Sequence, residues 1–94
     1  MTELKNYKMF IGGEWLDSDT DKTFETLNPE NNKPWARVPE ASASDVDKAV
    51  KAAHNAFEGE WSKLLPRDRA KFLRAIGNKL RENAELLGKI ETID

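Results

Sequence analysis

Few residues of this 94-residue chain could carry out chemistry, and their types exclude several reaction classes. No cysteine is present, so residues 1–94 hold no thiolate nucleophile, thiolate metal site or disulfide. His54 is the only histidine, and because no acid–base partner is indicated beside it, we expect it at the surface. The five glycines follow neither a dinucleotide-binding nor a phosphate-loop spacing.

Two groups of charged residues resemble functional sites but have simpler interpretations. Asp45 and Asp47 could form a paired-carboxylate site, yet capping a helix N-terminus explains both. Basic residues recur from Arg67 to Arg81, interleaved with acidic ones, and we interpret them as the solvated face of an amphipathic helix. The 17 acidic and 15 basic residues give a net charge of −2, which disfavours a basic-helix nucleic-acid binder.

The composition indicates a segment with little core of its own. Hydrophobic residues make up 38% of the chain and charged residues 34%, which is polar for an independent domain of this length. No apolar run is long enough to cross a membrane, and residues 1–8 show no signal peptide. We therefore expect a cytoplasmic chain, bound to neither membrane nor nucleic acid, that hides its apolar faces against something else.

The front of the chain predicts short strands over about residues 8–38. Gly12-Gly13 stands between two apolar runs and predicts a hairpin, because both turn positions can take a positive φ. Thr23–Leu27 alternates polar and apolar residues and predicts a further strand, which Asn28-Pro29 ends. Trp35–Val38 is a last extended piece.

The back of the chain predicts helices over about residues 43–58, 66–82 and 83–94. Ser42 or Ser44 can cap the first, with Asp45 or Asp47 completing a capping box. It should end near Gly59, a residue typical of helix C-termini. A connection should follow over residues 61–65, with Pro66 opening the second helix and Asn83 capping the third. The apolar stripes should stay exposed in a monomer, at Phe57, Phe72, Ile76, Leu80 and Ile90.

The order of these patterns resembles the aldehyde dehydrogenase superfamily. Residues 10–15 (FIGGEW) look like the family's opening INGEW-type hairpin, and residues 23–29 (TFETLNP) are similar to its TFxxxNP strand and stop. Residues 38–50 resemble the segment leading into its first helix. No one motif is specific, whereas their joint order over about residues 8–94 is. Residues 31–33 depart from the family's Thr-Gly-Glu-like turn, although Asn can adopt the left-handed conformation that Gly would supply.

The resemblance implies an α/β parent fold with a Rossmann-like cofactor domain, a catalytic domain and an oligomerisation hairpin. Residues 1–94 would be a partial N-terminal segment of the cofactor-binding domain: a β-hairpin and short strands, then two to three α-helices. The family's cysteine nucleophile, glutamate base and nucleotide-binding motifs lie later in its sequences. No catalytic or cofactor-binding residue is therefore assigned to this chain. We expect no turnover and no binding of NAD or NADP by the chain alone, and its partner would be the remainder of a homo-oligomeric subunit.

The resemblance also implies one candidate metal site, for a structural monovalent cation. In some family members, the positions matching Thr26 and Leu27 supply backbone oxygens, and the position matching Asp94 supplies a carboxylate. Such hard oxygen ligands suit Na⁺ or K⁺, and the remaining ligands would come from outside residues 1–94.

A different class of function stays open beside this one. The chain could be a small stand-alone protein-interaction module that uses exposed apolar helix faces to bind a partner or a second copy of itself. The aldehyde substrate and the choice between NAD and NADP are not set by the residues present.

Overall fold

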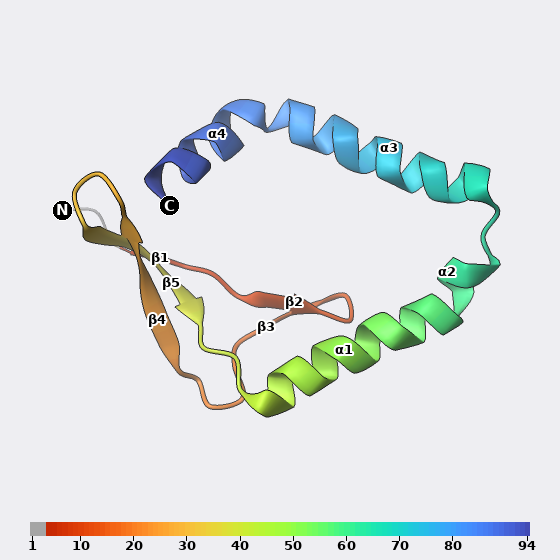
Figure 1. Cartoon of the computed structure of the whole chain (residues 1–94), viewed down its shortest axis with the longest axis horizontal. Coiled ribbons are helices and arrows are strands. Elements are labelled where there is room, and N and C mark those ends of the chain that lie inside the picture. The colour runs from red at the N-terminus through yellow and green to blue at the C-terminus, as the bar shows by residue number, and fades with distance from the viewer. Residues whose placement is uncertain (1–3) are drawn as a thin grey trace.

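The computed structural model describes residues 4–94 as short strands followed by helices (Figure 1). This confirms the predicted α/β arrangement. The strands are β1 (Lys5–Asn6), β2 (Met9–Ile11), β3 (Glu14–Leu16), β4 (Thr23–Asn28) and β5 (Lys33–Pro39). The helices are α1 (Ala43–Glu58), α2 (Glu60–Lys63), α3 (Pro66–Glu82) and α4 (Ala84–Ile93).

The predicted hairpin is formed by β2 and β3, which pair antiparallel. Its two turn residues, Gly12 and Gly13, have φ values of 60° and 83°, a region that side chains other than glycine rarely adopt. Phe10 and Trp15 face each other across the strands with ring centroids 4.8 Å apart. Both aromatic side chains are exposed.

A second sheet has the order β1-β5-β4, with β4 antiparallel and β1 parallel to β5. Asn32, in the turn between β4 and β5, has a φ of 58°, as its residue type indicates. β1 was not predicted, because Lys5 and Asn6 are two polar residues without strand periodicity. Its partner strand β5 is seven residues long and supplies the pairing.

Ser42, and not Ser44, caps α1. Asp45 N–H donates to Ser42 Oγ at 3.1 Å, and Ser42 N–H donates to Asp45 Oδ2 at 2.9 Å, which completes the capping box. The helix ends before Gly59, whose φ of −91° is not left-handed. Glycine is required there for space instead, because a Cβ atom would lie 2.8 Å from the carbonyl oxygen of Asn55.

The prediction of an irregular connection over residues 61–65 is wrong, because the single-turn helix α2 occupies most of this range. Ser62 Oγ donates to Gly59 O at 2.8 Å and supports this turn. The periodicity of apolar residues in the sequence does not reveal such a local hydrogen bond. Trp61 packs against Phe72 of α3, with ring centroids 5.7 Å apart. Arg69 Nη1 donates to Leu64 O at 2.6 Å. These contacts set the bend between α2 and α3.

Asn83 is the N-cap residue of α4, as predicted, although its side chain does not make the cap hydrogen bond. The side chain donates instead to Lys79 O of α3 at 2.9 Å, and the backbone N–H also turns back to the last carbonyls of α3. The residue therefore ends α3 with its side chain and backbone N–H, and begins α4 with its carbonyl, which accepts from Leu87 N–H at 2.9 Å.

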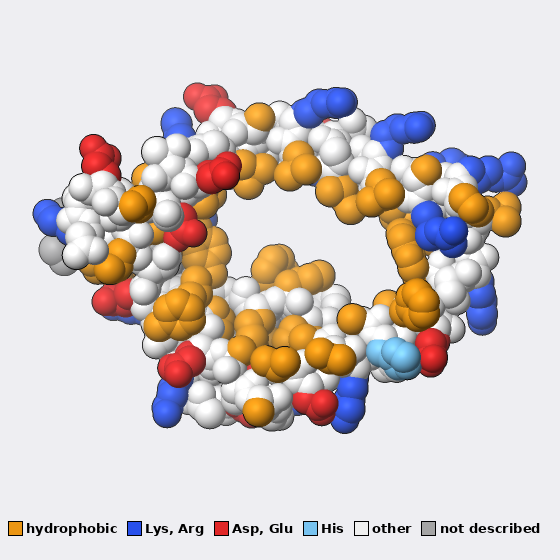
Figure 2. Space-filling view, viewed as in Figure 1, with side chains coloured by type: hydrophobic (Ala, Val, Ile, Leu, Met, Phe, Trp, Pro, Cys, Tyr) orange, Lys and Arg blue, Asp and Glu red, His pale blue; other side chains and the backbone are white. Residues whose placement is uncertain are grey.

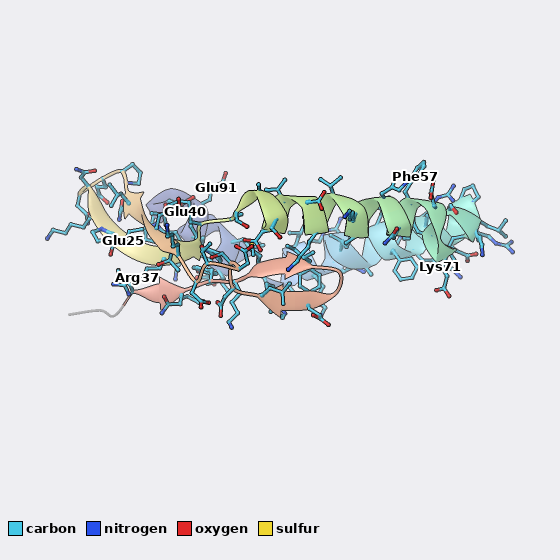
Figure 3. The ribbon with its side chains drawn as sticks, turned by 90° about the horizontal axis from the view of Figure 1, so that it is seen from below. Glu25, Arg37, Glu40, Phe57, Lys71 and Glu91 are labelled. Atoms are coloured by element: carbon cyan, nitrogen blue, oxygen red, sulfur yellow. The ribbon has the colours of Figure 1, made fainter. Side chains whose placement is uncertain are left out.

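The elements form a flat, open ring rather than a packed domain (Figures 1 and 2). Its extents are 49 × 34 × 17 Å, and Figure 3 shows the thin dimension edge-on. The radius of gyration is 16.8 Å, compared with about 12 Å for a compact domain of this length. Among residues 4–94, Ala36 is the only buried apolar residue. No helix in this range is long and apolar enough to cross a membrane.

The predicted exposure of the helix stripes is confirmed at four positions of five. Phe57 is 71% exposed, and the three α3 residues Phe72, Ile76 and Leu80 are 54–56% exposed. The prediction is wrong for Ile90, which is half-buried because it faces the sheet beside Phe24 and Trp35.

Candidate functional site

The candidate cation site lies where the C-terminal end of α4 meets β4. Thr26 Oγ1 donates a hydrogen bond of 2.7 Å to Asp94 Oδ1, between residues 68 positions apart. This contact brings the C-terminal end of α4 onto β4 and closes the ring (Figure 1). Two of the three residues expected at this site are in direct contact.

The third expected residue, Leu27, follows Thr26 at an irregularity in the β4–β5 ladder. Thr26 pairs with Ala36 and Leu27 with Pro34, so Trp35 is an extra residue on β5. Pro34 has no backbone N–H and cannot donate to the Leu27 carbonyl opposite it. The ladder is therefore irregular at Leu27, one of the two residues whose backbone oxygens were expected to bind a cation.

A pocket of about 360 Å³ opens beside Thr26 and Asp94, between the sheet and α4. Its walls are mostly apolar and include Tyr7, Phe24 and Ile90. Tyr7 meets the Trp35 ring edge-on at 6.1 Å, a favourable aromatic arrangement. The indole Nε1 of Trp35 is buried and finds no acceptor among residues 4–94. Sequence reasoning missed this pocket because its walls come from four separate elements.

The oxygen atoms at this junction are of the kind that binds a hard monovalent cation. Carboxylate and carbonyl oxygens are preferred by hard ions, whereas softer transition metals favour imidazole and thiolate. No group of three or more His, Cys, Asp or Glu side chains gathers within the part of the chain that the structure describes. Any ion held here would need further oxygens from outside it.

Asp45 is a structural carboxylate rather than half of a catalytic pair. It is 4% exposed, and besides Ser42 it accepts from the backbone N–H of Asp19 at 3.2 Å. The hydrogen bond from Ser42 N–H lowers the pKa of Asp45 below its usual value, and burial opposes this shift. The backbone N–H of Asp19, the Ser42 side chain and the charge of Lys48 lower the pKa further. The carboxylate therefore ties the loop before β4 to the start of α1.

The other charged candidates are surface residues. Asp47 pairs with Lys51 at 3.0 Å on the exposed side of α1. His54 is exposed and lies 3.2 Å from Glu58, one turn further along the same helix. On α3, Lys71 lies 3.7 Å from Asp68. Exposed pairs of this kind contribute little, which agrees with their interpretation as a solvated face.

Comparison with known proteins identifies the class to which this fold belongs. The profile of the aldehyde dehydrogenase family matches residues 15–94. An aldehyde dehydrogenase from Aspergillus niger is 44% identical over 86 residues, which are 92% of this chain and 17% of that protein. The human mitochondrial 10-formyltetrahydrofolate dehydrogenase is 43% identical over 89 residues, or 94% of this chain and 10% of that protein.

A solved structure shows the same conformation. The NAD⁺ complex of an aldehyde dehydrogenase from Bacillus cereus superimposes with a TM-score of 0.91 at 40% identity. The match covers 96% of this chain and 18% of that one. The chain belongs to the aldehyde dehydrogenase family, and it spans less than a fifth of the length of these relatives.

Proposed function

We propose that this chain forms the N-terminal segment of the cofactor-binding domain of an aldehyde dehydrogenase. The whole enzyme would oxidise an aldehyde to a carboxylic acid with NAD⁺ or NADP⁺ as hydride acceptor, in the cytoplasm and as a homo-oligomer. The observation that carries this proposal is the 0.91 TM-score to the Bacillus cereus enzyme, obtained with an open ring that lacks a core of its own.

The role of the chain within that enzyme is structural. Its 94 residues include no cysteine, so the thiolate that the family uses as nucleophile must come from elsewhere in the subunit. Its accessible surface of 7997 Å² exceeds by about 2,500 Å² the surface of a compact monomer of this mass. We infer that most of this excess is covered when the segment is part of a subunit.

A chimera tests the proposal. Residues 1–94 would replace the matching segment of the Bacillus cereus enzyme, and NADH formation from a panel of aldehydes would be compared for the chimera and the isolated chain. We expect an active chimera and no NADH from the isolated chain. An inactive but folded chimera would contradict the proposal, and so would turnover by the isolated chain.

The isolated chain also distinguishes the alternative of a stand-alone interaction module. That function requires a structure that persists without the rest of an enzyme. Chemical unfolding should therefore be weakly cooperative if the proposal holds. A steep, two-state transition with a large m-value would favour the module, because the m-value scales with the surface exposed on unfolding.

We also propose that Thr26 and Leu27, through their backbone oxygens, and Asp94, through its carboxylate, contribute to a Na⁺ or K⁺ site in the subunit. The irregular ladder at Leu27 and the position of Asp94 support this assignment. The melting temperature of the chimera should rise in K⁺ or Na⁺ relative to choline at equal ionic strength. Asp94→Ala should abolish the difference, and an unchanged difference would contradict the assignment.

A further inference from the structure

We propose that the apolar side of the ring is a docking surface that can bind the remainder of an aldehyde dehydrogenase subunit as a separate chain. The inference rests on the proposed function and extends it, because it requires that the contact forms without a peptide bond between the two pieces. The occupant is the part of the subunit beyond this segment, which makes up the larger share of the Bacillus cereus chain.

Two apolar grooves border the opening of the ring. One, of about 420 Å³, follows the α3–α4 junction and includes Ile76, Leu80 and Leu87. The other, of about 400 Å³, lies between the β2–β3 hairpin and α1 and includes Phe10 and Ala52. Figure 2 shows hydrophobic side chains along both of these edges of the opening. We call these two grooves together the apolar lining.

Most charged side chains of residues 4–94 lie away from the apolar lining, which Lys79 alone borders among the charged residues of the two grooves. On α3, Phe72, Ile76 and Leu80 recur every four residues and share one face. Arg67, Lys71 and Arg74 follow the opposite face at steps of four and three residues. In Figure 2 the basic side chains of this region project outward, away from the opening. An occupant of the opening would therefore meet an apolar surface and leave the charged side in solvent.

The surface available is large enough for stable association. The excess of about 2,500 Å² over a compact monomer is comparable with one partner's share of a large obligate interface, which buries about 2,000–5,000 Å² in total.

The bends of the ring are set by the chain's own contacts. The Ser42–Asp45 capping box begins α1, Arg69 fixes the α2–α3 bend, and Thr26–Asp94 closes the ring. The agreement with the Bacillus cereus enzyme extends over 96% of the chain. These contacts limit the conformational entropy that the chain loses when it assembles with its partner, which favours assembly from two pieces.

The test is co-expression of the 94-residue chain with a Bacillus cereus aldehyde dehydrogenase that lacks the matching segment. We expect the two chains to co-purify in equal amounts and to form NADH from an aldehyde. Ile76→Asp should reduce the recovered complex at least about tenfold, since it places a charge in the apolar lining. Arg74→Asp, on the opposite face of the same helix, is the matched control and should leave recovery within about twofold.

Ile76 is exposed, so Ile76→Asp should not unfold the isolated chain, and circular dichroism of both variants verifies this. Failure of the unmodified chains to co-purify would overturn the inference, as would equal recovery with Ile76→Asp and Arg74→Asp. A stable homodimer of the 94-residue chain that excludes the longer piece would also overturn it. Activity of the covalent chimera in any of these cases would leave the proposed function standing.

Discussion

Thr26 and Asp94 lie 68 positions apart in the sequence and are joined by one hydrogen bond of 2.7 Å. No regular secondary structure requires this contact, because β4 and α4 belong to different parts of the ring. Ile90, one turn before Asp94, packs into the same pocket. The position of α4 against the sheet depends on these few groups.

Thr26→Val tests this dependence, because valine keeps the shape of threonine and removes the hydroxyl donor. We expect α4 to detach more often, at a cost of up to about 1 kcal/mol, or about fivefold in population. Amide hydrogen exchange in α4 should accelerate accordingly. Thr23→Val on the same strand is the control for the gain in β propensity. Equal exchange rates in the two variants would show that the Thr26–Asp94 bond does not hold α4.

Ser42→Ala should destabilise α1 by about 1 kcal/mol, since it leaves the Asp45 N–H without its side-chain acceptor. Ser44→Ala is the matched control, because Ser44 lies inside the helix and does not serve as its cap. Far-ultraviolet circular dichroism during urea titration measures both. A larger loss with Ser44→Ala than with Ser42→Ala would contradict the assignment of the cap.

Asp45 should make the folded chain sensitive to acid. Folding lowers the pKa of its carboxyl, so its contribution to stability is fully present above the unfolded value of about 3.9. That contribution is lost as the pH falls through the lowered folded-state pKa. The carboxyl ¹³C shift should titrate with a midpoint below about 3.9, and Asp45→Asn should remove this part of the acid dependence. A midpoint at or above the unfolded value would refute the prediction.

Two glycines should respond oppositely to alanine. Gly59→Ala brings a Cβ atom to 2.8 Å from Asn55 O, so the end of α1 must shift and stability should fall. At Gly77, inside α3, an added Cβ meets nothing within 4 Å. Gly77→Ala should therefore raise helix stability by about 0.5–1 kcal/mol. The melting temperatures of the two variants test this prediction. A higher melting temperature for Gly59→Ala would contradict the steric conflict with Asn55 O.

Local signals predicted the local structure well. The Gly12-Gly13 turn, the Ser42 cap and the Pro66 start all depend on residues within a few positions of one another. The α2 turn was missed because a hydroxyl-to-carbonyl bond at Ser62 leaves no periodic pattern. β1 was missed for a related reason, since its two polar residues gain strand structure only from β5.

The candidate site could not be derived from periodicity or composition. Thr26 and Leu27 were named only because the chain resembles a known family, and nothing local relates them to Asp94. The pocket beside them combines Tyr7 with residues of β4, β5 and α4, which come together only in the tertiary structure. Trp35 illustrates the difference: its strand was predicted, whereas the bulge that displaces it was not.

The two uses of the Asp45 carboxylate have a consequence for the order of folding during synthesis. Asp45 joins the Asp19 loop to α1 across 26 positions, so the sheets and α1 can assemble once the ribosome has released the first half of the chain. The Thr26–Asp94 contact closes a longer loop, which costs more conformational entropy. This contact can form only after α4 has emerged. A nascent chain therefore stays an unclosed arc until α4 has emerged from the ribosome.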